Sequence, residues 1–255
     1  MQNSNFPSYS YNSDQVVQLG QKAIYRSAVF RRVALFLLIS CFVTTNLLAD
    51  EASVMPGIND HYLADPDYQR WVRMFERPGR EVFDQRRAVM EALDIQPGMD
   101  IADIGAGTGL YTRAFSDETG PEGMVYAVDI AENFVEGIMQ QAEAAGVKNV
   151  VGVINSAKDS HLQPASIDLA FVCDTYHHFE YPRSMLGSIH QALRPGGSLV
   201  IIDFRKIRGF SSNWVMSHTR ADKDTVISEI ESEGFKLTEE LDFMKTNYYL
   251  RFTRL

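Results

Sequence analysis

The chain has 255 residues, of which 45% are hydrophobic, and its 24 Lys and Arg stand against 33 Asp and Glu for a formal net charge of -9. This length and composition suit a globular protein with one sizeable core. The acidic balance disfavours nucleic acid as a partner, because non-specific binding to a phosphate backbone depends on clustered Lys and Arg. We therefore do not expect nucleic acid as a substrate.

Residues 29–49 have the pattern of a targeting segment. Two arginines precede an apolar run at 33–43, and Ala49 stands where a signal peptidase could cut. The run is shorter than the roughly 20 apolar residues of a spanning helix. It therefore favours an export signal, and a periplasmic protein, over a retained anchor that associates with the membrane. A lipoprotein signal at Cys41 and an uncut cytoplasmic chain are the alternatives.

The chain is expected to have three parts: a polar segment with the signal or anchor at 1–49, a helical lid segment at 50–96, and the main domain at 97–255. Cleavage after Ala49 would leave Cys173 as the one cysteine, so no intrachain disulfide is expected. Cysteine usage therefore does not identify the compartment. No sequence pattern indicates the oligomeric state.

Helical and strand patterns alternate through the second half of the chain. The expected helices are 80–95, 108–117, 131–145, 182–193 and 222–233. The expected strands are 99–104, 124–130, 150–154, 168–173 and 198–204. Two final strand-like runs, 235–243 and 247–255, form a hairpin that must add an antiparallel strand. The pattern predicts an α/β fold with a doubly wound, mostly parallel, seven-stranded Rossmann-like sheet and a C-terminal antiparallel hairpin.

The stretch "DIGAGTGLY" (103–111) follows the first strand and carries glycines on alternate positions. A glycine loop at a strand end lets a ligand approach the backbone, although a tight turn alone would also need glycine. The dinucleotide fingerprint G-x-G-x-x-G is not matched, because Leu110 stands where its last glycine belongs. Asp129 closes the second strand 20 residues beyond Gly109 and can either bind ribose hydroxyls or cap the next helix.

Together "DIGAGTG", "AVDI" (127–130) and "LRPGGSLVIIDF" (193–204), with the hairpin, resemble the small-molecule branch of the class I S-adenosylmethionine-dependent methyltransferases. The resemblance covers roughly 80–255 and makes 97–255 the S-adenosylmethionine-binding methyltransferase domain. It implies that Asp103 meets the cofactor's ammonium, that Asp129 holds the ribose and that Ile130 flanks the adenine. The backbone of Gly105, Ala106 and Gly107 would contact the methionine portion, and the remaining expected cofactor residues are Thr108, Gly109, Ser156 and Cys173.

One departure concerns the adenine. Many relatives carry an acidic residue after the third strand to bind the adenine amino group, whereas this chain reads "NSAKDSHL" at 155–162. The backbone at Ser156 or Ala157 is the expected substitute.

The stretch "CDTYHHFEYP" (173–182) ends the fourth strand, at the edge where doubly wound folds bind ligands. It lacks the Asn/Asp-Pro-Pro-aromatic motif of amine-modifying nucleic-acid methyltransferases. Its carboxylate, phenol and imidazoles suit removal of a proton from a small acceptor, so the candidate catalytic residues are Asp174, Tyr176, His177 and His178. Either histidine could instead face the core or cap the next helix. A metal site built from His177, His178 and Glu180 would need distant ligands, so no metal is expected.

Two flanking segments, 57–81 and 205–224, are expected to enclose the acceptor. Both are rich in aromatic residues and arginines, and a long loop in a compact domain is often functional. The candidate substrate-binding residues in them are Tyr62, Arg80, Arg205, His218 and Arg220. Any one of these could also be a packed aromatic or a solvated arginine.

The expected function is methyl transfer from S-adenosylmethionine to a small molecule. A thiol or sulfide acceptor is favoured, because a thiolate is nucleophilic near neutral pH and needs only a nearby base or cation. The alternatives are O- or C-methylation of a phenol or quinone-type precursor, a nicotinamide-dependent Rossmann oxidoreductase, and a non-catalytic protein that senses the cofactor.

Overall fold

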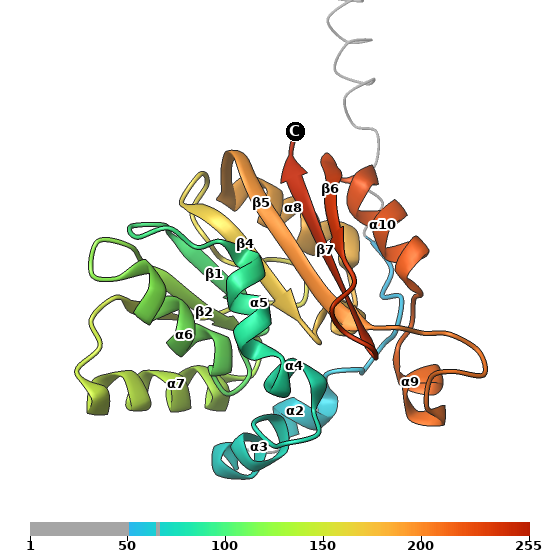
Figure 1. The fold of residues 1–255 in the computed structure, drawn as a ribbon, viewed down its shortest axis with the longest axis horizontal. Coiled ribbons are helices and arrows are strands. Elements are labelled where there is room, and N and C mark those ends of the chain that lie inside the picture. The colour runs from blue at the N-terminus through green and yellow to red at the C-terminus, as the bar shows by residue number, and fades with distance from the viewer. Residues whose placement is uncertain (1–50, 65–66) are drawn as a thin grey trace, which may run out of the picture. The chain divides into compact units, whose positions relative to one another are not determined.

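The computed structural model describes residues 51–64 and 67–255. These residues form a sheet of seven strands in the order β3-β2-β1-β4-β5-β7-β6 (Figure 1). The strands are β1 (Ile101–Ile104), β2 (Val125–Asp129), β3 (Val150–Ile154), β4 (Ile167–Cys173), β5 (Leu193–Phe204), β6 (Phe235–Leu241) and β7 (Asn247–Arg254). Strands β1 to β5 pair in parallel, and β7 is antiparallel to both β5 and β6. The predicted fold class is confirmed.

Helices cover both faces of this sheet. They are α2 (Asp60–Ala64), α3 (Tyr68–Phe75), α4 (Glu81–Asp84), α5 (Arg86–Leu93), α6 (Leu110–Thr119), α7 (Glu132–Ala145), the 3-10 helix η1 (Tyr176–His178), α8 (Pro182–Ala192), α9 (Asn213–His218) and α10 (Lys223–Ser232). Alternate residues of a strand point to opposite faces, so two apolar cores form. One core packs the buried sides of α8 and α10, and the other those of α5, α6 and α7.

Most predicted boundaries agree with the structure to within two residues, and three differ. The predicted helix 80–95 is divided at Gln85, whose backbone N–H bonds to both Glu81 and Phe83 and closes α4 early. Strand β5 starts at Leu193, five residues before the predicted start, because it pairs with Ile167 before its register shifts. The predicted loop 205–224 contains α9, which Ser212 caps by accepting a hydrogen bond from the backbone N–H of Val215.

The lid segment is attached to the domain by aromatic packing. Trp71 of α3 is 1% exposed and forms an apolar cluster with Ala131 and Phe134 at the start of α7. Tyr62, Tyr68 and Phe75 pack against the same cluster. The segments around α2 and α3 therefore lie at the carboxyl edge of the sheet, next to the ends of β1 and β2 (Figure 1).

Within the described residues, no helix is long and apolar enough to cross a membrane. The predicted targeting segment at 29–49, including its apolar run, lies outside these residues. The export signal and the three-part division at 49 and 96 remain predictions.

Candidate active site

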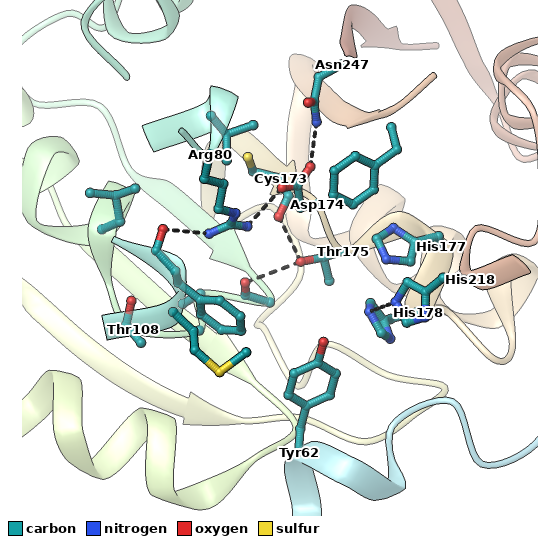
Figure 2. Close-up of a pocket in the computed structure, with 18 of the residues that line it drawn as sticks. Tyr62, Arg80, Thr108, Cys173, Asp174, Thr175, His177, His178, His218 and Asn247 are labelled. Carbon is teal, nitrogen blue, oxygen red and sulfur yellow. Dashed lines mark hydrogen bonds and ion pairs between the residues drawn. The ribbon is translucent and has the colours of Figure 1, made fainter. Parts of the chain in front are cut away.

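A cavity of about 1010 Å³ opens at the carboxyl edge of the sheet. Its walls come from the ends of β1, β2, β4 and β5, the lid segment, α9 and the turn between β6 and β7. Figure 2 shows how residues from these distant segments converge. The cavity is large enough for a cofactor and a small acceptor together.

The glycine loop presents its backbone to this cavity. The backbone N–H groups of Gly105 and Ala106 donate to the carbonyl of Val128, at 2.7 and 3.0 Å, which ties the loop to β2. Gly105 has a φ of 72°, and a Cβ added there would lie 2.2 Å from Thr175, so glycine is required. Gly109, which directly precedes α6, lies outside the cavity lining, and a Cβ added there would lie 2.8 Å from the Ile138 side chain of α7.

Asp103 and Asp129 are buried carboxylates that line the cavity. Asp103 accepts a hydrogen bond of 2.6 Å from the Thr112 hydroxyl, and burial raises its pKa to about 7. Asp129 accepts from the backbone N–H groups of Gly107 (2.8 Å) and Ala131 (2.9 Å), and burial raises its pKa to about 6. Asp129 thus makes the predicted helix-start contact and also faces the cavity. Both carboxylates are placed to gain from a cationic or hydroxyl-bearing ligand.

The expected adenine end of the cavity is lined by Ile130, Asn155, Ser156 and Ala157. The Asn155 Nδ2 donates to the Ser156 carbonyl at 2.8 Å, whereas its buried Oδ1 has no hydrogen-bond partner in the described part of the chain. A free buried acceptor is what an adenine amino group requires. Together with the glycine cradle and the two carboxylates, Asn155 makes these residues fit S-adenosylmethionine.

Asn155 was not among the predicted site residues. Its position directly after β3, where relatives carry an acid, was the available signal. All predicted cofactor residues except Gly109 line the cavity, Cys173 included. Burial raises the pKa of the Cys173 thiol.

Asp174 joins three segments beside the glycine loop (Figure 2). Its carboxylate pairs with the Arg80 guanidinium at 2.9 Å and accepts a hydrogen bond of 2.6 Å from the Asn247 side chain. Arg80 also donates to the Phe75 carbonyl at 3.1 Å, and its guanidinium lies 5.0 Å from the centre of the Phe75 ring. Both predicted residues line the cavity, but their charges neutralise each other. This pair connects the lid to β4 and the hairpin.

Three histidines gather on the other side of Asp174 (Figure 2). His177 is 3% exposed, and its Nδ1 lies 2.8 Å from an oxygen of Asp203, a β5 residue that sequence reasoning missed. The other carboxylate oxygen of Asp203 accepts from the His177 backbone N–H at 3.0 Å. His178 Nε2 lies 3.3 Å from His218 Nε2. Burial, with the neighbouring His177 and His218, lowers the pKa of His178 to about 2, so this ring is neutral.

Aromatic side chains enclose the histidines. Tyr62 meets His178 edge-on with ring centres 5.2 Å apart, and Trp214 stacks on His218 at 4.4 Å. Phe204 packs against both His177 and Trp214. All of these residues line the cavity, so this region is an aromatic pocket with imidazole nitrogens at its wall.

Three predicted site residues have other roles. Tyr176 is fully buried and donates to Glu229 at 2.7 Å, and Arg220 forms two hydrogen bonds to the same Glu229 while covering the Tyr176 ring. Both lie outside the cavity lining, because η1 turns Tyr176 into the core. Arg205 lines the cavity, but its guanidinium pairs with Asp242 at 2.5 Å and donates to the Asn247 carbonyl at 2.8 Å. Glu180, weighed as a metal ligand, instead accepts a hydrogen bond from Ser53.

Comparison with known proteins agrees with this geometry. Residues 102–201 match the family described as "Methyltransferase domain". A demethylmenaquinone methyltransferase from Geobacillus stearothermophilus is 27% identical over 139 residues, which are 51% of this chain and 59% of that protein. The ubiquinone/menaquinone biosynthesis C-methyltransferase UbiE from Hydrogenovibrio crunogenus is 28% identical over 123 residues, 48% of each protein. The chain thus spans about half of the length of these curated relatives.

Solved structures show the same architecture. A SAM dependent methyltransferase from Aquifex aeolicus superposes with a TM-score of 0.66 at 23% identity, over 75% of this chain and 99% of its own. At this identity the likeness concerns the fold.

Proposed function

We propose that this chain, whose central domain belongs to the class I S-adenosylmethionine-dependent methyltransferases, transfers a methyl group from that cofactor to a small aromatic acceptor. The acceptor class that we favour is a phenol or a reduced quinone precursor, methylated on oxygen or on a ring carbon. The cofactor would occupy the glycine loop, Asp103, Asp129 and Asn155. The acceptor would occupy the aromatic pocket beside the histidines.

The pairing of His177 with Asp203 inside an aromatic pocket carries this proposal. Asp203 binds the Nδ1 side of His177 at 2.8 Å, which leaves Nε2 for the cavity that His177 lines. An imidazole oriented in this way can take a proton from an acceptor hydroxyl, and the resulting phenolate is nucleophilic at its oxygen and at the adjacent ring carbons. The flat rings of Tyr62, Phe204 and Trp214 suit a flat acceptor. The printed names of the two curated relatives refer to quinone methylation, which supports the same class.

A thiol acceptor, which the sequence favoured, loses the support of nearby cations. That hypothesis relied on His177, His178 or the arginines of the two flanking segments to supply a base or a cation for the thiolate. Arg80, Arg205 and Arg220 each pair with a carboxylate, and His178 stays neutral. None of these four groups is therefore a free cation for sulfur.

The test is a methyl-transfer assay with the full chain, labelled S-adenosylmethionine and a panel of hydroquinones, catechols, thiols and sulfide. We expect turnover on hydroxylated aromatic acceptors. Replacing His177 with Gln should lower kcat by about 100-fold or more, as for loss of a general base. His161→Gln, an exposed position outside the cavity, is the matched control. Turnover confined to thiols, or full activity of His177→Gln, would contradict the acceptor class or the role of His177 respectively.

We also propose that the protein is exported or anchored through residues 29–49. The support is the pattern of two arginines, an apolar run and a small residue at 49. Fractionation with protease treatment of intact and permeabilised cells tests it. Protection in intact spheroplasts, with an uncut chain in the cytoplasmic fraction, would contradict it.

A further inference from the structure

Three histidine rings from two distant segments meet at the acceptor side of the cavity (Figure 2). His177 and His178 form part of η1, and His218 ends α9. One ring nitrogen from each lies within 4.8 Å of the other two. The centre of the His218 ring is 5.0 Å from those of His177 and His178, which are 4.3 Å apart. The metal site considered from the sequence lacked a residue from a distant segment, and His218 lies where such a residue would be needed.

Hydrogen bonding within the described residues leaves this cluster incomplete. His178 Nδ1 is buried without a partner, and the one contact of His178 Nε2 is the Nε2 of His218. Buried polar atoms are almost always satisfied, so such a group needs an explanation. A neutral imidazole carries a proton on one ring nitrogen and a lone pair on the other, so in either tautomer the buried Nδ1 of His178 has an unused proton or an unused lone pair.

The spacing suits a tetrahedral metal ion. Zn–N bonds of about 2.0–2.1 Å at tetrahedral angles place two ligand nitrogens about 3.3 Å apart. The observed distance between the Nε2 atoms of His178 and His218 is 3.3 Å. The His177 nitrogen lies within 4.8 Å of both, so a shift of at most about 1.5 Å brings it to the same spacing.

Asp203 supplies the outer contact that metal-binding histidines usually have. It binds Nδ1 of His177 at 2.8 Å, which fixes the ring and leaves Nε2 as the nitrogen with a free lone pair. A carboxylate behind a histidine ligand orients the ring and increases its basicity. Asp203 is itself 1% exposed and held by the Phe204 backbone N–H at 2.7 Å.

We propose that His177, His178 and His218 bind a divalent transition-metal ion of the zinc class, with its fourth coordination position open to the cavity. Imidazole ligands suit such ions, and three protein ligands with one open position are typical of catalytic rather than structural zinc sites. The site itself does not depend on the acceptor, whereas its role rests on the proposed function. With the ion bound, His177 Nε2 would be a ligand and not a free base, and the ion would promote deprotonation in its place, because an acceptor hydroxyl at the open position would lose its proton more readily.

The experiment is a titration of the untagged full chain with Co²⁺, followed by its visible absorption, with Zn²⁺ competition. We expect one ion per chain and the intense bands of four-coordinate Co²⁺. His178→Gln and His218→Gln should each weaken binding at least tenfold. Asp203→Asn, which removes no ligand, should weaken it about 10- to 100-fold. His61→Gln, which lines the same cavity outside the cluster, should leave binding unchanged.

Binding of S-adenosylhomocysteine to each variant shows whether its fold is intact. X-ray absorption at the cobalt edge of the unsubstituted protein provides an independent measurement and should show three imidazole ligands. The inference is overturned if no ion binds stoichiometrically, if binding survives in both histidine variants, or if fewer than three imidazoles surround the metal. If methyl transfer persists without metal, the proposed function stands and the catalytic role given to the metal is wrong.

Discussion

Asp103 and Asp129 are the two buried carboxylates at the carboxyl ends of β1 and β2. Few hydrogen bonds compensate each of them for the loss of contact with water. Asp129 has both oxygens bonded to backbone N–H groups of Gly107 and Ala131. A carboxylate accepts about four hydrogen bonds, so ribose hydroxyls can still bind to it. The structure therefore allows Asp129 to shape the loop and hold the cofactor at once.

Replacing Asp129 with Asn should weaken binding of S-adenosylhomocysteine by about 10- to 100-fold. The substitution removes charge-assisted hydrogen bonds, each of which contributes about 1.5–3 kcal/mol. Isothermal titration calorimetry measures the change. Asp117→Asn, at an exposed position on α6, is the matched control and should bind normally. Equal affinities of the two variants would remove Asp129 from the cofactor site.

The second residue prediction concerns pH. Burial raises the pKa of Asp103 from 3.8 to about 7 in the cofactor-free protein. The stability that this protonated carboxyl provides is present below pH 3.8 and is lost as pH rises through about 7. A cofactor ammonium favours the ionised carboxylate, so affinity should rise between about pH 5.5 and 7.5 with proton release on binding.

Calorimetry of S-adenosylhomocysteine binding in buffers of different ionisation enthalpy counts those protons. Asp103→Asn should bind more weakly, and the pH dependence that remains should centre near pH 6, where Asp129 titrates. A pH profile identical to that of the unsubstituted protein would show that Asp103 does not meet the ammonium.

Residues at the carboxyl end of a strand could be located from the sequence, and residues that depend on packing could not. Asp103, Gly105 and Asp129 reach the cavity because each is among the last residues of a buried strand or the first residue after it. Tyr176 and His177 are adjacent, yet the 3-10 turn sends one into the core and the other into the cavity. Local spacing does not encode that choice.

At the scale of elements, the contact between the lid segment and α7 requires glycine at position 137. A Cβ at Gly137 of α7 would lie 2.4 Å from the Tyr68 ring of the lid helix α3. The Tyr68 hydroxyl donates to the Thr108 carbonyl of the glycine loop at 2.8 Å. Displacing α3 would therefore disturb the loop as well.

Gly137→Ala should weaken cofactor binding and speed hydrogen exchange in α3. Gly187→Ala, also inside a helix, meets no atom within 4 Å and should stabilise the protein by about 0.5–1 kcal/mol through helix propensity. Thermal unfolding and hydrogen exchange compare the two. The same stabilisation from both substitutions, with unchanged cofactor affinity, would show that α3 is not held in this way.

Glu81 at the start of α4 holds the turn of the terminal hairpin. Its carboxylate accepts from the backbone N–H groups of Lys245 (2.6 Å), Thr246 (2.7 Å) and Asn247 (2.9 Å). Burial opposes its ionisation, but hydrogen bonds from the Thr246 side chain and these N–H groups outweigh that effect and lower the pKa. Glu81 therefore contributes stability above pH 4.5 that is lost as pH falls through the lower folded-state pKa.

Glu81→Gln should lower the free energy of unfolding by about 1 kcal/mol at neutral pH, a modest value because solvent reaches the carboxylate. The difference should shrink in acid, as followed by thermal unfolding. Glu91→Gln, whose side chain is 71% exposed, is the control and should change little. If the difference in free energy of unfolding between Glu81→Gln and the unsubstituted protein increased as the pH fell, the pKa of Glu81 would not be lowered by folding.

Most elements were predictable because hydrophobic periodicity marks each of them. The two exceptions with a clear physical cause are the break at Gln85 and the short helix α9. The first depends on the backbone conformation of one residue. The second depends on a single cap, Ser212, inside a polar stretch with little apolar period.

At the scale of the whole molecule, the sheet order brings the functional side chains together. Strands β1 and β4 are neighbours although 62 residues separate Ile104 from Ile167, so the glycine loop and Asp174 lie side by side. Strand β5 adds Asp203, and the hairpin adds Asn247. The fold class could be predicted from alternation, whereas the residues that β5 and β7 bring to the site required their register.

The most direct test of the central claim is titration of the full chain with S-adenosylhomocysteine and, separately, with NAD. The glycine loop, with Leu110 in place of the last fingerprint glycine, and the free acceptor of Asn155 predict a single site for S-adenosylhomocysteine and no binding of NAD. Asp129→Asn should weaken that site, which places it at the end of β2. Binding of NAD without binding of S-adenosylhomocysteine would contradict the assignment as a methyltransferase.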